Sequence, residues 1–238
     1  MRAYAQEQVR EWADQVEGRG YAMVHGVLSG DELVFLRGTL DHVYAIYDPE
    51  RDGLKRVPGY HFSSNLVNKN PFFETMFLRS PVYDIMRLVL GEDCILSSLN
   101  SFEPLKDQGN QGLHRDGPPR PPEETIALNS MWSVDGMDRE NGATRLIPGS
   151  HLHGEPPPAD EQGIIYAEAP PGSVVVTNAH ILHAASANPS GRRRRVMHGY
   201  FTRRGRPQQT EQRVFLSAEV QSRLSPQARR VLAIDQEP

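Results

Sequence analysis

Residues 173–201 of the chain read SVVVTNAHILHAASANPSGRRRRVMHGYF. An apolar, β-branched run opens this stretch, residues 184–191 are rich in turn formers, and a second strand-like run follows them. The pattern predicts two strands joined by a long turn. His183 then lies just before the turn, and Arg194 lies where the chain enters the second strand.

Short strand-like runs continue through the second half of the chain. Pro, Gly, Asn and Asp separate them, as is typical of turns between strands. Many short strands of this kind are typical of a β-sandwich or jelly roll. The runs cover residues 94–102, 125–134, 143–147, 163–166, 173–177 and 195–201.

Helical patterns precede these strands. Residues 4–17 are rich in helix formers, and Ser29 with Glu32 forms a capping box in front of a second amphipathic segment. Residues 81–90 form a third helical segment. Residues 48–70 show no clear periodicity, so we expect a long loop there.

The order of these patterns predicts one domain over residues 1–238. With 238 residues, 38% of them hydrophobic, the chain can bury one sizeable core. We expect a helical part over about residues 1–92 and a jelly-roll core over about 93–204, so that the fold is mainly β with flanking helices. A C-terminal extension is expected over 205–238, with one or two surface helices in residues 217–234.

Composition narrows the kinds of site that the chain can build. Cys94 is the single cysteine, so a metal would have to be bound by His, Asp or Glu. The formal net charge of -4 gives no overall attraction to nucleic acid or to an anionic membrane. Because no apolar run is long enough to cross a bilayer and no apolar signal segment opens the chain, we predict a cytoplasmic protein.

His114 and Asp116 are the first candidates for a metal site. They stand two residues apart, so in an extended backbone both side chains point to the same face. A second histidine from a distant strand would complete a face of two imidazoles and one carboxylate, with other positions left open. His183 is the leading candidate for this third ligand, ahead of His180 and His151.

Arg194 is the candidate for binding an anion beside that metal. It follows His183 by eleven residues, and its guanidinium group could bind the far carboxylate of a dicarboxylate with two hydrogen bonds. One hairpin would then supply both a metal ligand and an anion-binding group.

Three separated blocks of this sequence together resemble the phytanoyl-CoA dioxygenase family. Their order and spacing match that family from about residue 96 to residue 200. The blocks are His114-Arg115-Asp116, then Glu140-Asn141-Gly142-Ala143-Thr144-Arg145-Leu146-Ile147-Pro148-Gly149-Ser150-His151, then His183 with Asn188 and Arg194.

The resemblance implies a double-stranded β-helix, that is, a cupin-like jelly roll, with iron(II) bound by His114, Asp116 and His183. It implies that 2-oxoglutarate is a cosubstrate anchored by Arg194, with lesser contacts from Thr144 and Trp132, and that O₂ is the second cosubstrate. Trp132 has an alternative role as a packed core aromatic, the commoner fate of tryptophan on a strand.

The implied activity is the oxidation of an unactivated C–H bond in a small organic molecule, most simply its hydroxylation, with release of succinate and CO₂. A specialised metabolite is one class of substrate that the family suggests. Halogenating relatives carry a small residue at the position of Asp116, so this carboxylate favours oxidation. Desaturation, cyclisation and epimerisation use the same metal ligands and stay open.

Two alternatives belong to other functional classes. The first is a jelly-roll binding module without turnover, against which the complete set of candidate ligands argues. The second is an oxygenase for nucleic acid, for which the cluster from Arg192 to Arg195 would be the basic surface. The acidic net charge argues against the second, and substrate and oligomeric state cannot be read from the sequence.

Overall fold

The computed structural model describes residues 4–52, 57–116, 123–153 and 162–235. The proline-rich segments 118–122 and 156–158, whose composition predicts loops, lie outside these ranges. Within the described residues, no helix combines the length and the apolar character needed to cross a membrane.

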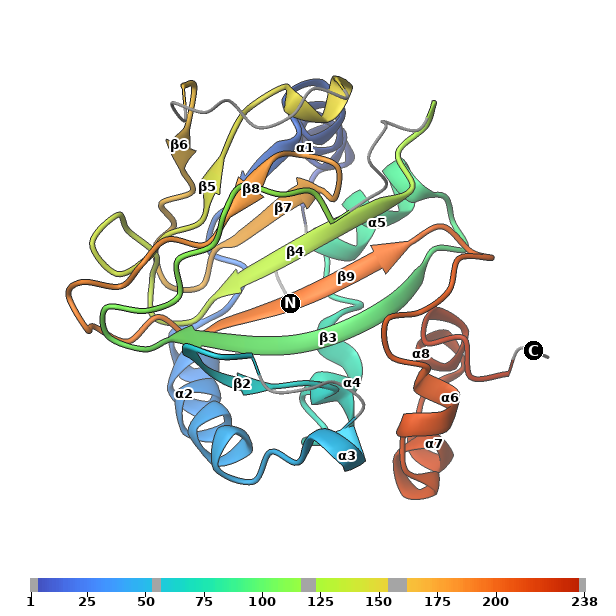
Figure 1. Cartoon of the computed structure of the whole chain (residues 1–238). Helices are drawn as coiled ribbons and strands as arrows, with labels where there is room; N and C mark the ends of the chain where they lie inside the picture. The colour runs from blue at the N-terminus through green and yellow to red at the C-terminus, as the bar shows by residue number, and fades with distance from the viewer. Residues whose placement is uncertain (1–3, 53–56, 117–122, 154–161, 236–238) are drawn as a thin grey trace.

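Two antiparallel sheets form the centre of the protein (Figure 1). The larger has six strands in the order β1-β7-β4-β9-β3-β2, and the smaller has three in the order β6-β5-β8. Together with the flanking helices they form the jelly roll that the sequence predicts. The strands are β1 (Tyr21–Val24), β2 (Tyr60–Ser63), β3 (Ile95–Pro104), β4 (Ala127–Ser133), β5 (Arg145–Leu146), β6 (Ile165–Tyr166), β7 (Val174–Asn178), β8 (His183–Ala184) and β9 (Val196–Thr202).

Alternation along the long strands divides the interior into two layers. On β4, Leu128 and Trp132 point to the face covered by helices and belong to the main hydrophobic cluster. Met131 lies on the opposite face and packs with Val175 and Val196 against residues of the smaller sheet. The second layer, between the two sheets, is therefore where a site can form with strand residues on both sides.

Helices cover the outer face of the larger sheet and the end beside the C-terminus (Figure 1). The capping box predicted at Ser29 is present, with Ser29 Oγ accepting from Glu32 N and Glu32 Oε2 accepting from Ser29 N. The C-terminal helices bury Val220 and Val231 in the main cluster and so extend the core. The helices are α1 (Gln6–Arg19), α2 (Gly30–Ala45), α3 (Pro49–Asp52), α4 (Phe73–Met76), α5 (Val82–Leu90), α6 (Gln212–Phe215), α7 (Ala218–Arg223) and α8 (Pro226–Val231).

The prediction of a long loop over residues 48–70 is wrong in part. This region contains α3, the strand β2 and the short 3₁₀ helix η1 (Leu66–Asn68). Strand β2 pairs with β3, placing Tyr60 opposite Pro104 and Ser63 opposite Ser101. Four residues are too few to show strand periodicity, and the edge of β3 supplies the backbone partners that make them a strand.

Candidate active site

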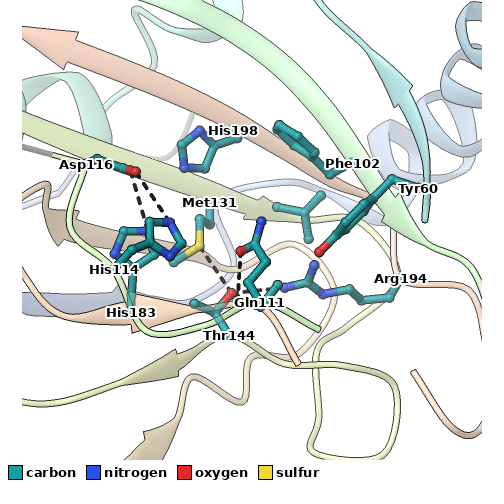
Figure 2. Close-up of a pocket in the computed structure, with 12 residues that line it drawn as sticks. Tyr60, Phe102, Gln111, His114, Asp116, Met131, Thr144, His183, Arg194 and His198 are labelled. Carbon is teal, nitrogen blue, oxygen red and sulfur yellow. Dashed lines mark hydrogen bonds and ion pairs between the residues drawn. The ribbon is translucent and has the colours of Figure 1, made fainter. Parts of the chain in front are cut away.

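His114 and His183 face each other across an isolated antiparallel bridge. The backbone N–H of each donates to the carbonyl of the other, at 2.9 and 3.0 Å. Asp116 extends the same segment, and its carboxylate lies beside both rings (Figure 2). Its Oδ1 is 3.7 Å from His114 Nε2, and its Oδ2 is 3.5 Å from His183 Nε2.

The chemistry of these three side chains fits a metal ion. His114 Nδ1 lies 2.9 Å from the carbonyl of Gly112, and His183 Nδ1 lies 3.0 Å from that of Ile181. Each Nδ1–H can therefore donate to a carbonyl two residues earlier, which leaves both Nε2 atoms unprotonated and free to bind a metal. Among the described residues, these three form the group of His, Cys, Asp or Glu able to hold an ion, with ligand atoms within 4.8 Å of one another.

The electrostatics favour the protonation states that a metal needs. Burial lowers the pKa of His183 and outweighs the nearby carboxylate, so its ring is neutral. Burial acts to raise the pKa of Asp116, but His183, His198 and the amide of Asn129 together hold it below the ordinary value. The site therefore presents one carboxylate beside the neutral imidazole of His183.

Arg194 lies at the opposite end of the same cavity (Figure 2). Its side chain is 4% exposed, and one Nη donates to Thr144 Oγ1 at 3.0 Å. Its Nε has no hydrogen-bond partner, and no carboxylate among the described residues pairs with it. Burial lowers the pKa of this guanidinium to about 10. A buried cation without a counter-ion is costly, so this end of the cavity is suited to an anion.

The cavity that joins the two ends has a volume of about 160 Å³. Pockets for drug-sized ligands usually measure about 300–1,000 Å³, so this one suits a small cosubstrate and leaves little further room. It is lined by Tyr60, Phe102, Gln111, His114, Asp116, Met131, Thr144, His183, Ala185, Arg194, Val196 and His198.

The other three arginines of the cluster are held by carboxylates outside the cavity. Arg192 pairs with Asp138, and Arg193 pairs with Glu103. Arg195 pairs with Asp135, whose oxygens accept from its Nε at 2.7 Å, its Nη2 at 2.8 Å and its backbone N at 3.0 Å. Arg192, Arg193 and Arg195 therefore do not form a surface of unpaired guanidinium groups. The hydrogen bond from the backbone N of Arg195 to Asp135 also fixes the backbone beside Arg194.

Loss of the buried ion pair between Arg195 and Asp135 is expected to destabilise the fold much more than loss of the neighbouring surface pair between Arg192 and Asp138. Arg195 and Asp135 are 7% and 10% exposed, so Asp135→Asn should lower the free energy of unfolding by about 3 kcal/mol. The matched control is Asp138→Asn, because Arg192 and Asp138 are 53% and 40% exposed and the expected loss is below about 1 kcal/mol. Urea denaturation measures both, and equal losses would contradict this account.

Trp132 does not reach the cavity, which corrects the cosubstrate contact expected of it. It is 1% exposed, belongs to the main cluster on the helix-covered face, and donates from Nε1 to Ser130 Oγ. The side chain of Met131, one residue earlier on β4, lines the cavity instead. The packed-core alternative therefore describes the position of Trp132.

The histidines ranked below His183 lie away from the metal candidates. His151 is buried, and its Nε2 is hydrogen-bonded to the carbonyl of Glu17 at 2.8 Å. His180 is also buried and lines a separate pocket with His151. The structure thus brings His114, Asp116 and His183 together and leaves the other two outside.

Several cavity residues were not predicted. Val196 and His198 follow Arg194 at intervals of two residues, and all three line the cavity. The alternation of side chains along a strand could therefore have predicted them from the sequence. His198 has its pKa lowered to about 4 by burial, which leaves a neutral imidazole near Asp116. Phe102 and Gln111 come from segments whose inward faces cannot be deduced without the fold.

Comparison with known proteins identifies the family of the chain. The family model for phytanoyl-CoA dioxygenase (PhyH) matches residues 16–196. The dioxygenase cnsJ of Penicillium expansum is 34% identical over 209 residues, covering 74% of this chain and 63% of that protein.

Solved structures share the fold at lower sequence identity. The α-ketoglutarate-dependent epimerase SnoN from nogalamycin biosynthesis has a TM-score of 0.70 at 17% identity, covering 84% of each chain. EctD from S. alaskensis, solved with 2-oxoglutarate and 5-hydroxyectoine, has a TM-score of 0.68 at 20% identity, covering 84% of this chain and 76% of that one. Since the family model matches most of the chain, this protein belongs to the phytanoyl-CoA dioxygenase family and is an iron(II)- and 2-oxoglutarate-dependent dioxygenase that uses O₂.

Proposed function

We propose that His114, Asp116 and His183 bind the iron and that Arg194 anchors 2-oxoglutarate. The observation that carries this proposal is the buried guanidinium of Arg194, which lies across one small cavity from the three candidate ligands and has no carboxylate partner among the residues that the structure describes. A dicarboxylate can satisfy both ends at once, because one end can bind the metal while the other neutralises the arginine.

The neighbours of Arg194 support a carboxylate in front of it. Thr144 Oγ1 accepts from Arg194 and donates to Met131 Sδ at 3.5 Å, so its place in the cavity wall is set from two sides. Met137 Sδ lies 3.5 Å from the same guanidinium nitrogen. Sulfur is a weak acceptor, so the N–H groups of Arg194 that do not bond to Thr144 remain available for a ligand.

The bound iron and cosubstrates would supply the oxidation of a C–H bond, which no side chain of this protein can perform alone. The chain's own residues hold the reactants in place and exclude water. Apolar side chains of Phe102, Met131 and Val196 line the cavity between the metal candidates and Arg194. Because the cavity is small, the organic substrate would lie over its mouth with one C–H bond toward the metal.

The substrate class we propose is a small organic molecule, such as a specialised metabolite, which the enzyme most simply hydroxylates. The description of SnoN as an enzyme of nogalamycin biosynthesis supports that class. Desaturation, cyclisation and epimerisation remain alternative outcomes at the same centre, because the ligand set is common to all of them. Analysis of the product separates them, since only hydroxylation adds one oxygen atom.

The test uses the purified protein without oxygen. Iron(II) and 2-oxoglutarate are added, and the weak visible absorption of the metal-cosubstrate chelate is recorded. We expect the band to saturate with both components, and O₂ should then yield succinate. A protein that shows neither band nor succinate, where a known family enzyme shows both, would instead be the non-catalytic binding module.

A further inference from the structure

The two carboxylate oxygens of Asp116 have different surroundings. Asn129 Nδ2 donates a hydrogen bond to Oδ2 at 2.8 Å, and that oxygen also lies 3.5 Å from His183 Nε2. Oδ1 lies 3.7 Å from His114 Nε2 and receives no hydrogen bond from the described residues. One oxygen is therefore already engaged by the protein, and the other is free.

Asn129 is held rigidly where it can make this bond. It stands on β4 opposite Thr177 of β7 and Tyr200 of β9, and it is 1% exposed. Its own Oδ1 is buried and has no hydrogen-bond partner in the described part of the chain. A buried amide with an unpaired oxygen is destabilising, so the hydrogen bond from its NH₂ group to Asp116 is the polar interaction that this side chain makes among the described residues.

The backbone of Asp116 is fixed independently of Asn129. Its N–H donates to the carbonyl of Ala179 at 2.9 Å, and its own carbonyl accepts from the hydroxyl of Tyr200 at 3.4 Å. The remaining freedom of Asp116 is rotation of its side chain. The amide of Asn129 opposes that rotation because turning the carboxylate would break the bond to Oδ2.

We propose that Asn129 is a positioning residue that reserves Oδ2, so that Asp116 binds the metal through Oδ1 alone. This inference rests on the ligand set proposed above. A carboxylate that binds through both oxygens occupies one more coordination position. Restricting Asp116 to one oxygen keeps open the positions that 2-oxoglutarate and O₂ require.

The experiment compares the full-length wild type with Asn129→Leu, which removes the donor at similar size, using cobalt(II) as the probe. Outer hydrogen-bond partners of metal ligands are typically worth about 10- to 100-fold in metal affinity, so a loss of that size is expected. A second oxygen on the ion would replace a water at one of the open positions, so the visible spectrum of the bound cobalt should also change. Asn129→Ser, which keeps a smaller donor, should recover part of both.

The matched control is Asn100→Leu. Asn100 is a buried asparagine of the same sheet that accepts from Asn65 N, and within the described part of the chain it has no hydrogen bond to a candidate ligand. Its loss should therefore leave the cobalt affinity and spectrum unchanged. Thermal melting of each variant checks that it is folded. Wild-type affinity and spectrum in Asn129→Leu, or equal losses in Asn129→Leu and Asn100→Leu, overturn the inference.

The same titration separates this inference from the proposed ligand set. If His183→Ala loses cobalt and Asn129→Leu does not, the ligand set stands and the role of Asn129 is wrong. If His183→Ala binds cobalt as the wild type does, the ligand set fails and the role of Asn129 fails with it.

Discussion

Arg194→Met is expected to abolish 2-oxoglutarate binding at concentrations that saturate the wild type, and also to stabilise the ligand-free protein. Removing one partner of a buried, hydrogen-bonded charge pair costs about 2–5 kcal/mol, which is roughly 30- to 5,000-fold in the dissociation constant. Titration of the anaerobic chelate band with 2-oxoglutarate measures this loss. Cobalt binding without 2-oxoglutarate should stay at the wild-type level.

Arg194→Met should weaken 2-oxoglutarate binding and yet stabilise the ligand-free protein, because the buried charge of Arg194 is favourable only when a carboxylate faces it. Burial lowers the pKa of Arg194 from its ordinary value to about 10, so the folded protein disfavours the charged form. Below pH 10 the guanidinium is protonated in the folded and in the unfolded protein. The full free-energy cost of burying its charge is then present in the folded state. At 1.36 kcal/mol per pKa unit, replacement by an apolar side chain should raise the free energy of unfolding by on the order of 3 kcal/mol.

The control for Arg194 is its neighbour Arg192, which is exposed and paired with Asp138. Arg192→Met should leave the affinity for 2-oxoglutarate unchanged and alter stability by less than about 1 kcal/mol. Urea denaturation without ligand measures the stability of both variants. The assignment of Arg194 would be wrong if Arg194→Met bound 2-oxoglutarate as tightly as the wild type.

His183→Ala is expected to remove the metal and with it all turnover. The substitution leaves two candidate ligands at a site where the ligand atoms of three lie within 4.8 Å of one another. The loss of iron(II) affinity should therefore exceed the roughly 10- to 100-fold loss that follows removal of a residue hydrogen-bonded to a metal ligand. The chelate band should be absent even at saturating 2-oxoglutarate, and no succinate should form. Metal titration and absorption spectroscopy check both expectations.

His151→Ala is the matched control for His183→Ala. His151 is a buried histidine whose Nε2 is hydrogen-bonded to Glu17, so its loss should affect folding stability and leave metal affinity unchanged. The ranking of the histidines would have to be reversed if His151→Ala lost the metal and His183→Ala kept it.

Local patterns in the sequence were enough for much of the fold and for the candidate ligands. The capping box at Ser29 needs only neighbours three residues apart, and the pairing of His114 with Asp116 follows from alternation over two residues. The sequence placed His183 and Arg194 at the two ends of one connection, and the cavity contains both. Each of these features depends on contacts that a short stretch of chain defines. The predicted hairpin is wrong, because β8 pairs with β5 in the smaller sheet whereas β9 pairs with β3 and β4 in the larger.

Other features were decided only when distant segments packed together. Alternation along β4 separates Met131 from Trp132, but it does not say which one faces the cavity, because the helices determine the outer face of the sheet. The carboxylates that hold Arg193 and Arg195 come from Glu103 and Asp135, far away in the chain.

Sequence patterns located the local elements, the three candidate metal ligands and the arginine opposite them. The packing of distant segments was needed to show that Arg194 has no carboxylate partner within the described residues, unlike the rest of its cluster, and that Asn129 engages one oxygen of Asp116. The physical reason is that backbone periodicity sets which side chains share a face, whereas burial and charge pairing depend on what packs against that face.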